Sequence, residues 1–182
     1  MKVSFLILAK KESKRLKNKN WRDFCGKPMF VWNVLKCKEL GDVYVSSESD
    51  MILKIAKKYG AMPIKRPKEL CGDIPNIPVY RHAIRFMGNT DTLIAVQANS
   101  PTIDKYLIEA AKEIMLSGFC RELMTCHNDF KLYGSIWAMS KKRLESYGDP
   151  CKQTPEILLV DESVDVHIYQ DFLNAKKQWT QA

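Results

Sequence analysis

The feature that most constrains this chain is a predominantly apolar run at its start, from Val3 to Ala9, which two lysines follow directly. Such a run is too short to span a bilayer as a helix, and no small-residue cleavage site comes after it. It therefore predicts a buried β-strand rather than a membrane anchor or a signal peptide. We expect no membrane association and a cytoplasmic protein.

The rest of the chain alternates between short apolar runs of β type and longer runs with helical spacing. This alternation is typical of an α/β sheet whose strands are joined by crossover helices. A length of 182 residues fits one hydrophobic core, and no internal repeat or low-complexity segment is visible. We therefore predict a single α/β domain over residues 1–182, Rossmann-like and three-layered, with a mixed, mostly parallel sheet.

The periodicity also places the individual elements. The predicted strands are 3–9, 43–46, 92–98, 122–126, 135–139, 156–160 and 164–168. The predicted helices are 28–40, 51–59, 79–87, 104–117 and 169–179. A proline-rich connection, 63–78, leads to the third helix.

The cysteines and histidines do not form a pattern that predicts a site of their own. The six cysteines, of which Cys151 is the last, include no CxxC pair, and the three histidines show no ligand spacing with them. This argues against a zinc site and against a disulfide framework. Reduced thiols in the cytosol are the default expectation.

Positive charge is concentrated in one short segment. The chain has a formal net charge of +8, and Lys10 to Arg22 contains seven basic residues against a single acid, Glu12. Such a concentration favours an anionic ligand bound at this segment over a generally basic surface. A solvated loop and a nucleic-acid patch are the alternatives. The segment lacks interleaved aromatic residues beyond Trp21, so we expect no nucleic-acid partner.

The predicted topology gives this segment a place in the fold. In Rossmann-like sheets, ligands bind beyond the carboxyl ends of the strands. The basic segment, Ser46-Ser47, 98–101 and His167 should therefore lie near one another. The segment contains neither the GxGxxG of dinucleotide binding nor the GxxxxGK[ST] of a P-loop, so any phosphate would be held in another way. Lysine ammonium groups and a serine hydroxyl offer suitable donors.

The segment resembles the signature of the CMP-sugar synthetases, that is, the acylneuraminate and 3-deoxy-manno-octulosonate (Kdo) cytidylyltransferases. Their A-R-x-x-S-[KT]-[GR]-[LI]-P-x-K motif follows the first strand. The matching positions are Ala9, Ser13, Lys14, Arg15, Leu16 and Lys19. The chain departs from the motif at Lys10, where the family has Arg, and at Lys17, where it has Pro.

Further segments are similar to the family in the same order along the chain. They are Gly26-Lys27-Pro28, Val45-Ser46-Ser47-Glu48-Ser49, 56–61 with 66–73, Val96-Gln97-Ala98-Asn99-Ser100-Pro101, Gly134-Ser135-Ile136-Trp137, and 163–167 with Asp171-Phe172. Each match alone is weak, but their order over nearly the whole length carries the resemblance. It implies a fold of the nucleotide-diphospho-sugar transferase type and transfer of CMP from CTP to a hydroxyl of an acidic sugar, with release of pyrophosphate.

The resemblance also implies roles for individual residues. The triphosphate of CTP would be held by Lys10, Ser13, Lys14 and Lys19, with Lys19 the foremost candidate to stabilise charge in the transition state. The other implied nucleotide or acceptor positions are Ala9, Asn20, Arg66, Asp73, Gln97, Asn99 and Ser100. Plainer interpretations stay open: Lys14 and Lys19 as surface lysines, Arg66 paired with Glu69, and Gln97 as a core amide.

The implied metal site contains a departure from the family. Asp165 matches a metal-binding aspartate, but His167 stands where the family has a second one. Mg²⁺ prefers oxygen ligands, whereas imidazole suits softer metals. Three interpretations remain: Asp165 suffices with water and phosphate, the metal preference has changed, or the site is impaired. Asp165 could also cap or pair with the last helix.

A second departure concerns the acceptor and the oligomeric state. In the acid-sugar synthetases, a long segment before the N-G-A-I-Y strand supplies dimer contacts and part of the sugar pocket, and here only 127–133 stands in its place. Monomer and homodimer both stay open. Two alternative functions also stay open: transfer of CMP to another small hydroxyl, phosphate or phosphonate compound, or nucleotide binding by a weakened member of the family.

Overall fold

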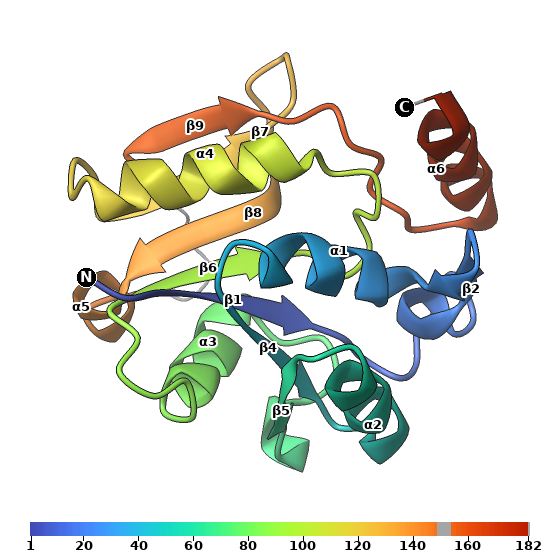
Figure 1. Cartoon of the computed structure of the whole chain (residues 1–182), viewed down its shortest axis with the longest axis horizontal. Helices are drawn as coiled ribbons and strands as arrows, with labels where there is room; N and C mark the ends of the chain where they lie inside the picture. Colours follow the sequence, from blue (N-terminus) through green and yellow to red (C-terminus); the bar gives the residue numbers. More distant parts are fainter. Residues whose placement is uncertain (149–153, 182) are drawn as a thin grey trace.

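The computed structural model describes residues 1–148 and 154–181, and β-strands organise that part of the chain (Figure 1). The strands are β1 (Val3–Leu8), β2 (Asp23–Phe24), β3 (Lys27–Pro28), β4 (Asp42–Ser47), β5 (Met62–Lys65), β6 (Thr92–Val96), β7 (Glu122–Cys126), β8 (Leu132–Ser140) and β9 (Ile157–Val160). Seven of them form one sheet in the order β5-β4-β1-β6-β8-β7-β9, while β2 and β3 form a small hairpin. Within the sheet, β8 is antiparallel to β6 and β7, and the other pairs are parallel.

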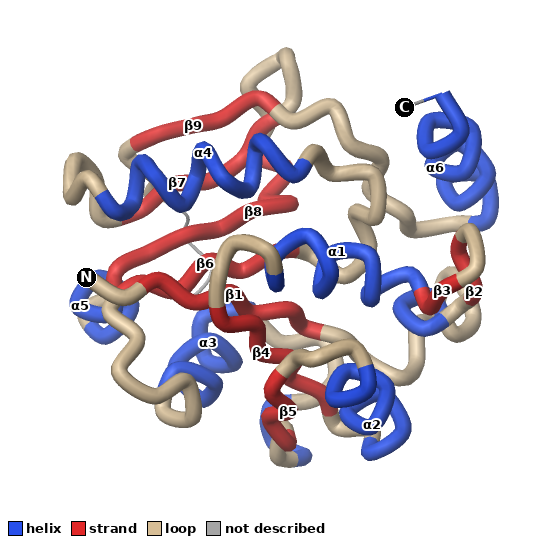
Figure 2. The backbone as a smooth tube through the Cα atoms, viewed as in Figure 1, coloured by secondary structure: helices blue, strands red, loops and turns tan. Residues whose placement is uncertain are grey.

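Helices cover both faces of the sheet (Figure 2). They are α1 (Met29–Lys38), α2 (Asp50–Lys58), α3 (Asn76–Ile84), α4 (Lys105–Leu116), α5 (Lys141–Glu145) and α6 (Tyr169–Gln181), with 3₁₀ turns η1 (Lys19–Trp21) and η2 (Lys68–Leu70). Successive residues of β1 point to opposite faces, as in any strand. Phe5 and Ile7 pack in one core with α1, α2 and α4, whereas Leu6 packs in the other with α3 and α5. The predicted three-layer α/β fold with a mostly parallel sheet is confirmed.

The last helix belongs to a third, smaller core outside the three layers. Phe172 of α6 packs with Phe24 of the β2–β3 hairpin, with Leu16 and with Met29 at the start of α1. The Phe24 and Phe172 rings meet edge to face, with centroids 5.7 Å apart. Figure 1 shows α6 beside β2 at one side of the molecule. This core joins the end of the chain to the hairpin that follows the basic segment.

The structure corrects one predicted strand. Residues 164–168 are not a strand. The backbone N–H of Val164 donates to Thr102 Oγ1 at 3.0 Å, and that of Val166 donates to the carbonyl of Asn99 at 2.9 Å. Val166 is buried in the α6 core. The alternation of apolar residues in this segment therefore arises from packing against a loop and α6, and not from pairing within the sheet.

Several short elements were absent from the prediction. β5 forms a parallel edge strand beside β4 within the segment predicted as a proline-rich connection. Its residue Pro63 lowers strand propensity, but an edge strand tolerates proline. The hairpin β2–β3 and the five-residue helix α5 were also missed, and α3 begins three residues earlier than predicted. Such short elements contain too few residues for a periodic signal.

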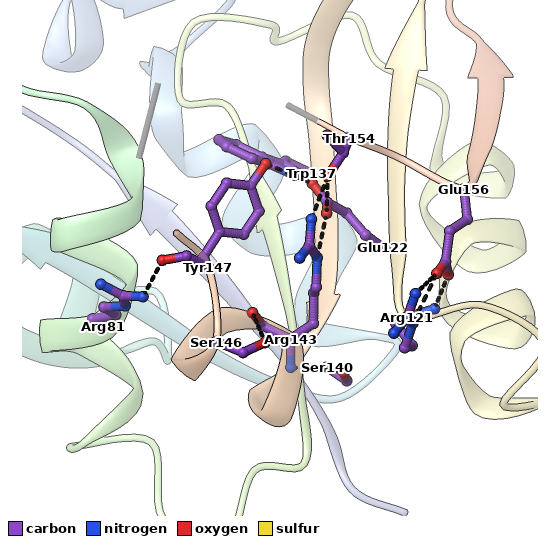
Figure 3. Close-up of polar contacts among 10 residues, drawn as sticks. All are labelled: Arg81, Arg121, Glu122, Trp137, Ser140, Arg143, Ser146, Tyr147, Thr154 and Glu156. Atoms are coloured by element: carbon purple, nitrogen blue, oxygen red, sulfur yellow. Dashed lines mark hydrogen bonds and ion pairs between the residues drawn. The ribbon is translucent and has the colours of Figure 1, made fainter. Parts of the chain in front are cut away.

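The amino-terminal edge of the sheet holds a buried carboxylate, Glu122, at the start of β7 (Figure 3). Glu122 Oε1 accepts hydrogen bonds from Trp137 Nε1 at 2.9 Å and from the Tyr147 hydroxyl at 3.1 Å. Its Oε2 accepts one from Arg143 Nε of α5 at 2.8 Å. Because a buried charge is tolerated only when it is paired, this cluster fixes α5 and the following turn against β7 and β8.

The described residues include five of the six cysteines. Cys25, Cys37, Cys71, Cys120 and Cys126 are free thiols, whereas Cys151 lies outside the described residues. Within residues 1–148 and 154–181, no helix combines the length and the apolar character needed to cross a bilayer.

Candidate active site

A cleft of about 850 Å³ opens at the carboxyl edge of the sheet. Leu8 at the end of β1 lies at its base, and the basic segment, Arg66 after β5 and Gln97 after β6 lie around it. The full set of lining residues is Leu8, Lys10, Glu12, Ser13, Lys14, Arg15, Leu16, Lys19, Asn20, Arg66, Gly72, Asp73, Ile74, Asn76, Val79, Gln97, Asn99 and His167. The location agrees with the rule that ligands bind beyond the carboxyl ends of strands in such sheets.

The backbone around the basic segment is held by hydrogen bonds to the end of β4 and within the segment itself. The Ala9 N–H donates to the Ser46 carbonyl at 3.1 Å, which extends the pairing of β1 with β4 by one residue. Asn20 Nδ2 donates to the Lys10 carbonyl at 2.9 Å, and Trp21 Nε1 donates to the Lys11 carbonyl at 3.0 Å. These bonds curl the chain back between residues 10 and 21, so its side chains line one wall of the cleft.

Two of the predicted triphosphate lysines meet an acidic residue across the cleft. Lys14 Nζ lies 2.6 Å from Asp73 Oδ2, and Lys10 Nζ lies 3.9 Å from Asp73 Oδ1 and donates to the Gly72 carbonyl. The hydrogen bond and charge of Asp73 raise the pKa of Lys14, and Lys14 in turn lowers the pKa of Asp73. Both side chains of the Lys14–Asp73 pair are largely exposed, so the pair is weak and easily exchanged for another anion.

Lys19 is partly buried, and it is the lysine of the segment whose pKa burial lowers. Burial lowers the pKa of Lys19 from its ordinary value of 10.5, the charge of Asp165 opposes that shift, and the charges of Arg15 and Lys10 add to it. The part of the structure described here gives the Lys19 ammonium no hydrogen-bonded acid. A desolvated cation without a bound anion is suited to receive an anionic ligand.

Arg66 forms the inner wall of the cleft. It is only 2% exposed. Its Nε donates to Ser46 Oγ at 3.2 Å, and one terminal nitrogen donates to the Ser46 carbonyl at 2.7 Å. Burial lowers the pKa of Arg66. Its contacts to Ser46, rather than to Glu69, fix the guanidinium beside the end of β4.

The loop after β6 places the predicted acceptor residues. Gln97 and Asn99 line the cleft, whereas Ser100 is buried behind them and its hydroxyl lies 2.6 Å from the Tyr133 hydroxyl. Asn33 of α1 donates from Nδ2 to the carbonyls of Gln97 and Ser100. The loop is therefore held from behind by α1 and by β8.

The predicted metal residues form a hydrogen-bonded chain with Arg15 at the mouth of the cleft. His167 Nε2 lies 2.5 Å from Asp165 Oδ2, and Asn99 Nδ2 donates to Asp165 Oδ1. An Arg15 guanidinium nitrogen lies 2.6 Å from His167 Nδ1. Since arginine can only donate, His167 accepts at Nδ1 and donates from Nε2 to Asp165. Asp171 of α6 accepts from the backbone N–H groups of His167 and Ile168 at 2.8 and 2.9 Å.

This arrangement bears on a divalent cation. Among the described residues, no group of three or more His, Cys, Asp or Glu side chains could hold a metal ion. Mg²⁺ is often held by one or two carboxylates together with substrate phosphates and water. Each oxygen of Asp165 keeps a free lone pair after its hydrogen bond, so Asp165 fits such a site, and His167 orients it.

The structure brings most of the predicted site residues together. Those that line the cleft are Lys10, Ser13, Lys14, Lys19, Asn20, Arg66, Asp73, Gln97, Asn99 and His167. Ala9 and Ser100 are buried at its margin, and Asp165 touches it through Asn99 and His167. The sequence assigned no role to Asn33, because neither the helical pattern nor a motif marks a residue that acts on a distant backbone carbonyl. Ser46 was expected near the cleft, but its contact with Arg66 was not predicted.

Comparisons with known proteins indicate the family of this chain. The cytidylyltransferase family profile matches residues 4–136. The pseudaminic acid cytidylyltransferase of Campylobacter jejuni subsp. jejuni serotype O:2 is 31% identical over 122 residues, which cover 62% of this chain and 53% of that protein. N-acylneuraminate cytidylyltransferase B of Danio rerio is 32% identical over 119 residues, which cover 63% of this chain and 28% of that protein. The chain thus spans about half or less of these relatives.

A solved structure shows the same fold over the whole chain. The CTP complex of a CMP:2-keto-3-deoxy-manno-octonic acid synthetase superposes with a TM-score of 0.79, at 15% identity, and covers 100% of this chain and 99% of that one. The family profile extends from β1 through most of β8 and so includes the basic segment, Arg66 and the loop after β6. This chain belongs to the cytidylyltransferase family.

Proposed function

We propose that this protein transfers CMP from CTP to a hydroxyl of an acidic sugar of the sialic-acid or Kdo type and releases pyrophosphate. The observation that carries the proposal is the cleft itself, where a curled basic segment faces a buried arginine and a braced polar loop. The fold explains why three separate parts of the chain meet there. The names of the relatives supply the acceptor class.

The triphosphate lies along the basic segment. Lys10, Lys14 and Lys19 offer three cations, and the Ser13 hydroxyl offers a further donor. Binding exchanges the weak contact of Lys14 with Asp73 for contacts with phosphate oxygens. Because negative charge grows on those oxygens during transfer, a fixed cation in a partly desolvated position stabilises the transition state. Lys19 is that cation.

The nucleoside end of CTP points toward Arg66 and Asn20. Asn20 and Arg66 are both buried; the Lys10 carbonyl after β1 holds Asn20, and the Ser46 hydroxyl and carbonyl near the end of β4 hold Arg66. Fixed donors of this kind recognise a base or ribose by geometry rather than by charge. They complete the nucleotide half of the cleft.

The acceptor enters on the side of Gln97 and Asn99. Its hydroxyl oxygen forms the new bond to the α-phosphorus of CTP and gives up its proton to solvent, while the bond from the α-phosphorus to the oxygen of the β-phosphate breaks and pyrophosphate leaves with that oxygen. Catalysis by this loop consists of alignment of the attacking oxygen with the α-phosphorus. The same half of the cleft would accept another small hydroxyl, phosphate or phosphonate compound if its size and charge match.

A divalent cation completes the site, with Mg²⁺ the first candidate and Mn²⁺ the alternative. Asp165 would hold it, and the cation would supply charge neutralisation at the phosphate oxygens. Asn99 and His167 orient the Asp165 carboxylate, and Arg15 orients the imidazole.

A second candidate function is nucleotide binding without turnover. It is favoured by His167, which stands in the metal region and is engaged by both Arg15 and Asp165. Replacement of His167 by Asp and of Lys10 by Arg would then raise turnover sharply. Unchanged turnover in H167D and K10R would argue against this second candidate.

The proposed function is tested first by binding and then by turnover. Thermal unfolding is measured with CTP, UTP, ATP or GTP and with Mg²⁺ or Mn²⁺. Of the four nucleotides, we expect only CTP to raise the Tm, by about 5 °C or more at saturating concentration, because a ligand that binds only the folded state stabilises it. Pyrophosphate release is then measured with a panel of acidic sugars. An equal response to all four nucleotides, or no release with any acidic sugar, would contradict the proposal.

A further inference from the structure

Two side chains of α1 reach the backbone of the loop that follows β6. Asn33 Nδ2 donates to the Gln97 carbonyl at 2.8 Å and to the Ser100 carbonyl at 2.9 Å. Lys36 Nζ donates to the carbonyls of Pro101 and Ile103, each at 2.7 Å. Asn33 and Lys36 are three residues apart in a helix, so they lie on the same face, one turn apart. Together they engage four carbonyls within residues 97–103.

Asn33 is committed to this contact. Its side chain is completely buried, and within the described residues its Oδ1 has no hydrogen-bond partner. An unpartnered buried oxygen costs free energy, so a residue chosen only for packing would be apolar. The polar side chain is explained by its amide nitrogen, which serves two carbonyls at once. These two hydrogen bonds fix the position of the loop relative to α1.

Lys36 binds the same loop with a charged group. Burial lowers the pKa of Lys36 to about 8, and its ammonium lies 5.3 Å from the centroid of the Trp179 ring of α6. The two carbonyls and the ring offset part of the desolvation. The Lys36 ammonium therefore binds the loop rather than remaining free in solvent.

The loop that is held carries the predicted acceptor residues. The Gln97 carbonyl is bound by Asn33, and the Asn99 side chain contacts Asp165. The Asn99 carbonyl also accepts the N–H of Val166, so the loop in turn supports the segment that holds Asp165 and His167. A shift of the loop would therefore act first on Gln97 and Asn99 at the acceptor side of the cleft, and on the basic segment only indirectly, through Asp165 and His167.

We propose that Asn33 and Lys36 are positioning residues that brace the loop 97–103, and that this brace sets the alignment of the acceptor sugar relative to CTP. The inference rests on the proposed function for its catalytic meaning. The brace acts through backbone carbonyls, so neither residue touches a substrate. It is distinguished from a general structural role by its selectivity: it affects the acceptor and spares the nucleotide.

The test compares variants of α1 in the full chain. K36M keeps the length of the stem and removes the donor, whereas N33A removes both amide donors. K36R keeps a charged donor, and K38M changes an exposed lysine two residues further on, at the end of the same helix. We expect K36M and N33A to raise the KM for the acceptor about tenfold, as for a lost charge-assisted or buried hydrogen bond, with the KM for CTP changed less than about twofold. K36R recovers part of the loss, and K38M matches the wild type.

A second measurement does not depend on turnover. Amide hydrogen exchange of residues 97–104 is followed by mass spectrometry in the same proteins. We expect K36M to speed exchange in residues 97–104 and to leave exchange in the basic segment unchanged. N33A also creates a cavity, so the conclusion rests on K36M and not on N33A. If an active K36M protein keeps the wild-type KM for the acceptor, or loses affinity for CTP and acceptor equally, the brace is overturned. If the wild type binds CTP but transfers CMP to no acceptor, the proposed function is overturned and the catalytic role of the brace with it.

Discussion

The two edges of the sheet treat charge in opposite ways. At the amino-terminal edge, Glu122 is completely buried and receives side-chain hydrogen bonds from four residues, among them Arg143 (Figure 3). At the carboxyl edge, the Asp73 side chain is 73% exposed and shares the charges of Lys10 and Lys14. The charged groups at the amino-terminal edge stabilise the fold, whereas those at the carboxyl edge are free to bind a ligand.

The difference follows from what each arrangement does for stability. A buried carboxylate without its partners is strongly destabilising, so the Glu122 cluster contributes to folding by being complete. Exposed ion pairs contribute little, so the lysines of the cleft can exchange Asp73 for phosphate at small cost. Lys19 differs from Lys10 and Lys14, because it is partly buried and has no acid bonded to it in the described part of the chain. Function and stability should therefore respond to different residues.

The largest effect is expected from Lys19. K19A should reduce kcat/KM about a thousandfold, because a fixed cation that meets transition-state charge in a partly desolvated site is worth that much. The Tm should not fall, since the change removes a buried charge. K17A is the matched control, an exposed lysine outside the lining of the cleft, and should retain activity. Steady-state kinetics and thermal unfolding of both variants would decide; equal losses in K17A and K19A would contradict the assignment.

The next effect is on stability at the opposite edge. E122A should lower the free energy of unfolding by about 3 kcal/mol, because Arg143, Trp137 and Tyr147 lose their shared buried acceptor. Denaturant titration measures this, and CTP affinity of the folded protein should be unchanged. E156Q, which breaks a largely exposed pair with Arg121, is the control and should have little effect. A fully stable E122A would remove the contrast between the two edges.

A smaller effect is expected at Asp73. D73N removes the acid that Lys14 and Lys10 share, so both ammonium groups become free to meet phosphate. We expect no measurable change in Tm, because the pair is exposed, and a severalfold lower Kd for CTP at low salt. Calorimetric titration at two salt concentrations checks this. Weaker CTP binding would show instead that Asp73 itself contacts the bound nucleotide complex.

The smallest expected effect is a shift in pH dependence. Burial lowers the pKa of Lys19 below 10.5, so its charge and the activity that needs it are present below the shifted pKa and are lost as pH rises through it. In K19R the guanidinium stays charged, and the alkaline limb of kcat/KM for CTP should move to higher pH. Profiles between pH 7 and 10 test this, and coincident limbs would argue that another group titrates.

The sequence was sufficient to predict the parts of the site that are contiguous. The basic segment stands out by charge, and its position after the first apolar run places it at the carboxyl edge of a parallel sheet. Arg66, Gln97 and Asn99 came from short motifs at the ends of predicted elements. All of them lie around one cleft because strand order, and not sequence distance, brings strand ends together.

Other parts of the site could not be predicted from the sequence for physical reasons. Asn33 and Lys36 act on backbone carbonyls about sixty residues away, and no local pattern encodes such a contact. Residues 164–168 alternate like a strand, although their hydrogen bonds go to Thr102 and Asn99. In each case a tertiary contact determines the structure, and the local spacing of apolar residues does not predict that contact.

The central claim is that the basic segment holds the triphosphate of CTP in the cleft at the carboxyl edge of the sheet. The most direct measurement is a crystal structure of the protein with CTP and a divalent cation. We predict phosphate oxygens within hydrogen-bond distance of the Lys14 and Lys19 ammonium groups, with Lys14 released from Asp73. A nucleotide bound elsewhere, with Lys14 still paired to Asp73 and Lys19 without a phosphate contact, would contradict the account.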